Sequence, residues 1–262
     1  MSLAPSFNLL TKFSKIEECV SPNLNIASMR SSSMGLPTSL QRWIKKRIPG
    51  DRVMRRIYLR EGGESIIDEV VDALRRGKLI IYPTDTVYGL GADAENIDAV
   101  RRVYEVKGRP EEKRLTIAVS DIEMAERYAV VDEISRRLME KFLPGKVTFI
   151  LKKTSRVPDI VNPEAIGIRI PNIPIILRII REFGRAITAT SANKSGSPPK
   201  LDPEEAAMEI EADLLLDYGR LPFSRPSTIV DLTRGEPILV REGDVPFSLV
   251  MREYSRIRYL LA

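Results

Sequence analysis

The sequence contains no histidine and a single cysteine, Cys19, among its 262 residues. The absence of histidine excludes Ser-His-Asp and Cys-His catalysis, together with every zinc site that is built on histidine. One cysteine cannot form an internal disulfide, and this is typical of a reducing compartment, so we expect a cytoplasmic protein. No apolar run approaches the roughly 18–20 residues of a membrane-spanning helix, so we expect no membrane contact. Acid–base chemistry would therefore depend on carboxylates, lysine, tyrosine or the substrate itself.

The net charge of +5 is distributed unevenly along the chain. Residues 1–60 hold 11 Lys and Arg against 3 Asp and Glu, whereas the remainder holds 30 against 33. We predict that residues 1–60 are a basic, poorly ordered N-terminal extension, and that the mildly acidic body does not bind nucleic acid through its own charge. Three interpretations of residues 1–53 stay open: a phosphate-contacting segment around Lys45-Lys46-Arg47, an organelle transit peptide, or residues that precede a natural start at Met54.

From residue 61 onward the patterns predict intermixed helices and strands. A first helix begins near Glu64 and ends at Gly77, and Asn96 is predicted to N-cap a second helix that Gly108 ends. Further helices are predicted at about 121–129, 132–142, 174–183, 203–211 and 247–261, and strands at 79–82, 115–119, 147–151, 166–170, 186–190, 213–216, 227–231 and 237–241. Because no strict strand–helix–strand rhythm occurs, we expect an α/β (α+β) fold: a twisted mixed β-sheet with helices packed on it. Residues 61–245 would form the catalytic domain, and residues 246–262 a C-terminal amphipathic helix.

The most informative stretch follows the apolar run 79–82. Pro83 ends this strand, and two hydroxyls, a carboxylate, a tyrosine and two glycines follow within ten residues. Hydroxyls can donate and accept hydrogen bonds, and glycine lets a ligand approach the backbone closely. The pattern fits the floor of a pocket, but it fits an ordinary polar turn equally well.

Other polar residues are spaced in a way that suits an anionic ligand. Lys107 and Arg109 combine a point charge with a planar fork, and Ser191 and Asn193 repeat the same spacing with neutral donors. Arg169 lies among apolar residues at the end of a strand, where it could clamp a carboxylate or simply face solvent. Because no phosphate-binding or dinucleotide-binding glycine motif occurs, any nucleotide site must be built from side chains such as these.

These residues fall within a set of motifs that resembles the YrdC-like family. The motifs are YPTDTVYGLG at 82–91, KGRP at 107–110, LPGKVT at 143–148, IRIP at 168–171, TSANKSG at 190–196, STIVD at 227–231 and LVREG at 239–243. They occur in the family's order and cover roughly residues 64–245. One motif would be suggestive, whereas the ordered set is specific.

The resemblance implies an L-threonylcarbamoyladenylate synthase of the short, single-domain form, which is a nucleotidyltransferase. Such enzymes join L-threonine, bicarbonate or CO2, and ATP into threonylcarbamoyl-AMP and release pyrophosphate, for the modification of adenosine 37 in tRNA. The resemblance also implies Mg²⁺ entering with ATP, no metal site built by the protein, and transfer of the adenylate to a tRNA threonylcarbamoyltransferase. Direct contact with tRNA or double-stranded RNA is a further implied partner interaction.

The resemblance also assigns residues to the two substrates. The catalytic group around the ATP phosphates would comprise Lys107, Arg109, Ser191 and Asn193, with Lys113, Ser197 and Arg241 as further ATP contacts. The threonine contacts would be Thr84, Arg169 and Thr228, with Arg169 on the carboxylate. The chain departs from the family's pattern at Lys113-Arg114-Leu115 and at Ala118, where many members have Asn-Pro-Leu and a later histidine. It also departs at Pro226, where a glutamate is usual.

Two other functions are compatible with the resemblance. YrdC-like domains have been proposed to bind double-stranded RNA without adenylate synthesis; the acidic body argues against this alternative, and the basic extension keeps it open. They also make a carbamoyl-adenylate in hydrogenase maturation, but in larger chains with zinc-binding cysteines, which this sequence lacks.

Overall fold

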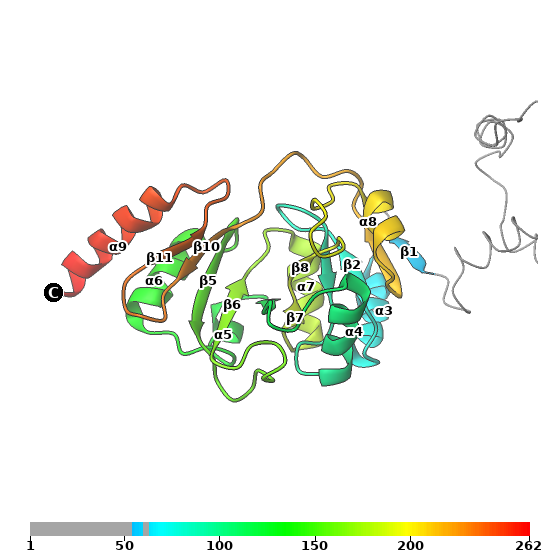
Figure 1. The fold of residues 1–262 in the computed structure, drawn as a ribbon, viewed down its shortest axis with the longest axis horizontal. Helices are drawn as coiled ribbons and strands as arrows, with labels where there is room; N and C mark the ends of the chain where they lie inside the picture. The colour runs from blue at the N-terminus through cyan, green and yellow to red at the C-terminus, as the bar shows by residue number, and fades with distance from the viewer. Residues whose placement is uncertain (1–53, 60–62) are drawn as a thin grey trace, which may run out of the picture. The chain divides into compact units, whose positions relative to one another are not determined.

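The computed structural model describes residues 54–59 and 63–262 (Figure 1). The three interpretations of residues 1–53, including the phosphate-contacting segment around Lys45-Lys46-Arg47, therefore lie outside the described residues. Residues 55–58, which the sequence analysis placed in the N-terminal extension, form a strand of the body, β1 (Arg55–Tyr58). The described part of the chain thus extends the folded body by one strand beyond the predicted boundary.

The first sheet has five strands and mixes parallel with antiparallel pairing. Its order is β1, β9 (Leu214–Asp217), β2 (Ile80–Tyr82), β3 (Gly89–Gly91) and β8 (Thr190–Ser191). The first three strands are parallel to one another, whereas β3 and β8 run antiparallel to their neighbours. Every residue of β2 and β9 is buried. This explains why β2 and residues 214–216 of β9 are continuous apolar runs rather than alternating ones.

The second sheet has six strands and is also mixed. Its order is β11 (Ile238–Arg241), β10 (Thr228–Asp231), β5 (Val147–Lys152), β6 (Ala165–Arg169), β4 (Thr116–Ala118) and β7 (Ile187–Thr188). The pairs β10–β5 and β4–β6 are parallel, and the remaining pairs are antiparallel. The fold class is therefore confirmed as mixed α/β, but the strands divide into two sheets instead of one.

Helices cover both sheets. They are α3 (Glu64–Arg75), α4 (Ile97–Lys107), α5 (Ile122–Ala125), α6 (Glu133–Phe142), α7 (Pro174–Phe183), α8 (Pro203–Glu209) and α9 (Phe247–Leu261). Helix α3 packs against α7, and α8 packs on β2 and β9. The predicted C-terminal helix α9 packs on α6 with Val250, Tyr254 and Ile257 buried, so its apolar stripe is covered by the body.

The predicted caps of the second helix are confirmed. The side chain of Asn96 accepts hydrogen bonds from the backbone N–H groups of Asp98 and Ala99 at the start of α4. Gly108 follows the helix in the left-handed conformation, with φ of 56°. These two residues fix where α4 ends, and hence where Lys107 and Arg109 lie.

The predicted strand at 186–190 is divided between the two sheets. Residues 187–188 belong to the second sheet as β7, and residues 190–191 belong to the first as β8. The chain crosses between the sheets at Ala189, whose N–H donates to the carbonyl of Thr116 at 2.8 Å. The polar loops that surround this crossing come from both sheets.

Among the described residues, no helix is both long and apolar enough to cross a membrane.

Candidate active site

A cavity of about 230 Å³ lies where the two sheets meet. Five of the residues singled out in the sequence line it: Thr84, Arg109, Arg169, Ser191 and Arg241. The sequence analysis missed several further polar lining residues, namely Thr86, Arg114, Thr116, Thr148, Thr190 and Ser227. The described structure therefore gathers distant motifs at one site.

The cavity is strongly positive. Four arginines line it, at positions 109, 114, 169 and 241, and no carboxylate is among its lining residues in the described part of the chain. Burial lowers the pKa of Arg109. Burial and the nearby charge of Arg169 lower the pKa of Arg241. Cations whose protonation is opposed in this way favour an anionic ligand, because such a ligand would offset both effects.

Arg169 lies at the centre of the site, at the end of β6. Its side chain is 11% exposed, and its guanidinium donates to the Asp85 carboxylate at 2.8 Å and to the Thr86 hydroxyl at 3.1 Å. Its Nε is buried without a hydrogen-bond partner in the described residues, and so is Oδ2 of Asp85. A buried guanidinium with one unused N–H is suited to bind a ligand carboxylate. The carboxylate of Asp85, in the loop after β2, holds the guanidinium in place.

The loop after β2 forms a tight turn that supports Arg169. The Thr84 hydroxyl donates to the Val87 carbonyl at 2.7 Å and accepts from the N–H groups of Thr86 and Val87, both at 3.2 Å. It lies 3.0 Å from the Thr86 hydroxyl, which in turn accepts from Arg169. Thr84 therefore lines the cavity but uses its hydroxyl mainly to hold the turn.

The two glycines after this loop serve packing in addition to any ligand approach. A Cβ on Gly89 would lie 3.0 Å from the ring of Tyr82, and a Cβ on Gly91 would lie 2.9 Å from it. Tyr82 is directly opposite Gly89 in the antiparallel pair β2–β3 and is itself buried. The glycines leave room for this ring beneath the site, a role that the sequence analysis did not predict.

Lys107 and Asn193 lie beside the cavity but are not among its lining residues. Lys107 is 2% exposed, and its ammonium donates to the carbonyls of Ser191 and Asn193 at 2.5 and 2.6 Å. Burial, with a further contribution from Arg109, lowers the pKa of Lys107 to about 8. The Asn193 amide donates to the carbonyls of Lys194 and Ser197, and its Oδ1 is buried without a partner among the described residues. Lys107 thus holds the loop that carries Ser191.

Thr228 also lies behind the cavity wall. It is fully buried, donates to the Val245 carbonyl at 2.6 Å and accepts from the Gly243 N–H at 2.9 Å. Its neighbour Ser227 lines the cavity instead, and its hydroxyl lies 2.8 Å from that of Thr148. The guanidinium of Arg241 donates to the Ser227 carbonyl through Nε at 3.1 Å and through a terminal nitrogen at 3.0 Å.

The structure explains why the motif at 239–243 ends in a glycine. A Cβ there would lie 2.1 Å from the Pro226 carbonyl oxygen and 2.7 Å from the Thr228 nitrogen. No side chain fits, because the backbone of residues 226–228 passes directly against it. This contact fixes Ser227 and Arg241 relative to each other.

Lys113 and Ser197 do not line the cavity. Lys113 is exposed, and only its carbonyl contributes near the site, accepting from Nε of Arg109 at 2.8 Å. A terminal nitrogen of Arg109 also donates to the Arg114 carbonyl at 2.8 Å. Ser197 is half-buried in the loop that Asn193 braces. Arg114, next to the predicted Lys113, is the lining cation of this segment.

Within residues 54–59 and 63–262, no group of three or more His, Cys, Asp or Glu residues could hold a metal ion. The cations and hydroxyls of the cavity are donors, and therefore suit an anion.

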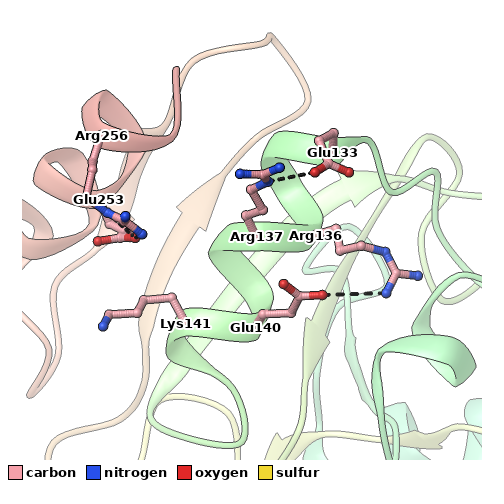
Figure 2. Close-up of a pocket in the computed structure, with 7 residues that line it drawn as sticks. All are labelled: Glu133, Arg136, Arg137, Glu140, Lys141, Glu253 and Arg256. Carbon is pink, nitrogen blue, oxygen red and sulfur yellow. Dashed lines mark hydrogen bonds and ion pairs between the residues drawn. The ribbon is translucent and has the colours of Figure 1, made fainter. Parts of the chain in front are cut away.

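A second hollow, of about 470 Å³, lies between α6 and α9 and contains none of the predicted site residues (Figure 2). Only charged residues line it: Glu133, Arg136, Arg137, Glu140, Lys141, Glu253 and Arg256. Arg137 pairs with Glu133 at 2.6 Å, Arg136 with Glu140 at 3.7 Å, and Arg256 with Glu253. Three of its four cations pair with its three carboxylates, so the cavity between the sheets is the better candidate site for an anion.

Comparison with known proteins identifies the family. The model of the Sua5, YciO and YrdC family, which is described as "Telomere recombination", matches residues 72–243. The chain belongs to this Sua5/YciO/YrdC family. The match contains all of the cavity-lining arginines.

Three relatives define the similarity. A putative threonylcarbamoyl-AMP synthase from Methanocaldococcus jannaschii is 40% identical over 195 residues, which are 73% of this chain and 92% of the relative. A threonylcarbamoyl-AMP synthase from Pyrococcus abyssi is 35% identical over 190 residues, which are 71% of this chain but 56% of the relative. The chain thus spans about half the length of that curated relative. YciO from Escherichia coli strain K12, which is named an uncharacterized protein, is 35% identical over 186 residues, or 69% of this chain and 90% of the relative.

The solved structure of P. abyssi Sua5 complexed with L-threonine is similar in fold. It is 33% identical, with a TM-score of 0.71, over 77% of this chain and 60% of that chain. The similarity confirms the family resemblance and the fold class inferred from the sequence.

Proposed function

We propose that this protein is a threonylcarbamoyl-AMP synthase, which makes threonylcarbamoyl-AMP and pyrophosphate from L-threonine, bicarbonate or CO2, and ATP. The observation that carries the proposal is the cavity between the sheets, which is lined by four arginines and several hydroxyls and, in the described part of the chain, by no carboxylate. Relatives named for this activity, and a related structure that holds L-threonine, support it.

The reaction requires two anions to be held together. The threonine amine attacks CO2, loses a proton to water and becomes a carbamate. A carbamate oxygen then attacks the α-phosphorus of ATP, and the bond to the β-phosphate oxygen breaks to release pyrophosphate. Both steps develop negative charge on oxygen, so positioned cations and donors can supply most of the catalysis. The absence of histidine is therefore compatible with this chemistry.

In this proposal Arg169, which lines the cavity, binds the threonine carboxylate, with Asp85 and Thr86 fixing the guanidinium. Arg109, Arg114 and Arg241, which also line the cavity, bind the phosphates. Ser191 is a neutral donor to phosphate oxygen, and Lys107 supports it by holding the carbonyls of its loop.

The remaining predicted residues take indirect roles. Asn193 and Ser197 brace the loop that carries Ser191, and Lys113 contributes its carbonyl to the placement of Arg109. Thr228 holds the segment that presents Ser227. Ser227 and Thr148 are the hydroxyls that would contact threonine from that wall of the cavity.

Mg²⁺ is expected to enter with ATP. Since the described residues offer no cluster of metal ligands, the phosphate oxygens and water would hold the ion, and the ion would neutralise part of the phosphate charge. In this proposal the product passes to a tRNA-modifying transferase, and the chain itself can be tested for contact with tRNA. The comparisons favour the synthase over the RNA-binding alternative, since the named relatives are synthases.

The test is release of pyrophosphate by the purified full chain with ATP and bicarbonate, with and without L-threonine. We expect release that depends on threonine and is lost in Lys107→Ala and Arg169→Ala. Release that is independent of threonine, or no release at all, would refute the proposal. Because the family also includes proteins named as uncharacterized, D-threonine and L-serine should be compared as control substrates.

A further inference from the structure

The connection from β9 to β10 leads from the first sheet to the second (Figure 1). We call residues 218–227 the strap. Near its start, the Gly219 carbonyl accepts from the Tyr88 hydroxyl at 2.7 Å, and the Leu221 N–H donates to the Leu201 carbonyl at 2.8 Å. Its last two residues, Pro226 and Ser227, line the cavity.

The far end of the strap is held by one carboxylate. Asp244 accepts from the Ser224 hydroxyl at 2.6 Å and from the Arg225 N–H at 3.1 Å, and it pairs with Lys146 at 2.8 Å. Lys146 and Ser224 lower the pKa of Asp244 to about 2, so the carboxylate is charged at neutral pH. Both ends of the strap are therefore fixed to the body.

Between these anchors the strap holds one aromatic ring out into solvent. Phe223 is 86% exposed and follows the exposed Pro222, whereas Leu221 and Ser224, which flank this pair, are buried. No large apolar side chain among the described residues is more exposed. A single exposed ring is common on protein surfaces, but this one is three residues from Pro226, and hence within about 10 Å of a cavity-lining residue along the chain.

The size of the cavity limits which part of a bound nucleotide it can enclose. Pockets that enclose drug-sized ligands have volumes of roughly 300–1,000 Å³, whereas this cavity has about 230 Å³. It cannot enclose threonine together with the whole of ATP. Because its arginines attract the phosphates and the carboxylate, the base of the nucleotide must lie outside, at the mouth.

We propose that Phe223 stacks on the adenine ring of ATP while the phosphates occupy the cavity. Every base presents an apolar π-face, and an aromatic side chain is its usual stacking partner. Fixing the strap at both ends places the ring before the nucleotide arrives, which reduces the ordering needed on binding. This inference depends on the proposed function, since it takes the ATP site as given.

The experiment compares binding of ATP with binding of inorganic tripolyphosphate, which has the phosphates but no base. Affinities of the full chain are measured by titration calorimetry without threonine or bicarbonate. The variants are Phe223→Ala, Phe223→Trp and, as a matched control, Tyr259→Ala on α9, whose ring is 84% exposed. We expect Phe223→Ala to weaken ATP binding roughly 5- to 150-fold and to leave tripolyphosphate binding unchanged. Phe223→Trp should restore ATP affinity, and Tyr259→Ala should bind both ligands as the wild type does.

Equal ATP affinity in the wild type and in Phe223→Ala would overturn the inference and leave the proposed function intact. An equal loss of ATP and tripolyphosphate affinity would also overturn it, because the ring would then act on the shape of the cavity and not on the base. If wild-type protein bound neither ligand, the proposed function would fail, and this inference with it.

Discussion

The burial of the Lys107 ammonium should have a measurable effect on the free energy of unfolding. Its side chain is 2% exposed, and burial beside Arg109 lowers its pKa from 10.5 to about 8. At about 1.4 kcal/mol per pH unit, keeping this ammonium charged in the folded protein costs roughly 3 kcal/mol at neutral pH. A cost of this size is unusual for a residue that only supports a fold, and it is consistent with a role at an anion site.

The substitution Lys107→Met removes this cost but takes the ammonium donor away from the carbonyls of Ser191 and Asn193. The Ser191 carbonyl keeps the backbone N–H of Asn193 as a donor at 3.0 Å, whereas the Asn193 carbonyl loses the donor that the described residues give it. An unsatisfied buried carbonyl costs about 1–3 kcal/mol, so the gain and the loss largely cancel. We expect the free energy of unfolding at pH 7, measured by urea denaturation, to change by less than about 3 kcal/mol. ATP affinity should nevertheless fall, because the loop of Ser191 loses its support.

The pH dependence separates the contribution of the ammonium from the packing of its side chain. Below pH 8 the folded and unfolded states both hold the Lys107 proton, and between about pH 8 and 10.5 only the unfolded state holds it. By linkage, the stability of the wild type relative to Lys107→Met should therefore rise with pH across this range, by roughly 3 kcal/mol. The ATP affinity of the wild type should change in the opposite direction and fall as pH rises through 8. Lys107→Arg keeps its charge and should lack this fall.

Two results would refute this reasoning. Parallel stability profiles of the wild type and Lys107→Met from pH 7 to 10 would show that the ammonium is not destabilised by burial. Unchanged ATP affinity in Lys107→Met would show that the loop of Ser191 does not depend on Lys107.

Three further predictions concern the walls of the cavity. Arg169→Gln should lose at least 30-fold in threonine affinity and should also destabilise the fold, because Asp85 loses its partner. Adding Asp85→Asn should recover stability but not threonine binding. Normal threonine affinity in this double variant would contradict the binding of the threonine carboxylate by Arg169. Gly243→Ala should lower the free energy of unfolding in urea by about 3 kcal/mol or more, because its Cβ would lie 2.1 Å from the Pro226 carbonyl oxygen. Gly63→Ala, whose Cβ would have no atom within 4 Å, is the control and should change it by less than about 1 kcal/mol. Similar losses in the two variants would contradict the close backbone contact at Gly243. Asp244→Asn should be less stable than the wild type above about pH 4, by about 1 kcal/mol or less, because the ion pair with Lys146 is partly exposed. The difference in the free energy of unfolding should vanish as pH falls toward 2, where the wild-type carboxylate becomes protonated. A difference that persists at pH 2 would contradict the ion pair.

The sequence was sufficient to predict the secondary structure around the site. Helical spacing, the Asn96 cap and Gly108 predicted α4 and its end, and the apolar runs predicted the central strands of both sheets. The ordered motifs predicted which segments meet, because each lies at the start or the end of a strand or helix. Family membership, confirmed by comparison, follows from the same motifs.

The sequence could not show which member of each motif faces the ligand. Thr228 and Ser227 are neighbours with similar hydroxyls, and only the β10 register turns Ser227 toward the cavity and Thr228 toward Val245. The glycines at 89 and 91 suggested access for a ligand, yet the structure shows that the ring of Tyr82 lies beneath them. The division of residues 186–190 between two sheets was also not predictable, since one short strand-like run has no signal for a change of partner.

If threonine, bicarbonate and ATP react in the cavity between the sheets, the carbon of bicarbonate must appear in the adenylate. The full chain is therefore incubated with ATP, L-threonine and ¹³C-bicarbonate, and the adenylates are analysed by mass spectrometry. We predict threonylcarbamoyl-AMP whose carbamoyl carbon carries the label, formed by the wild type and absent in Asp85→Asn/Arg169→Gln. Formation of no labelled adenylate by folded wild-type protein, or equal formation by the double variant, would contradict the claim.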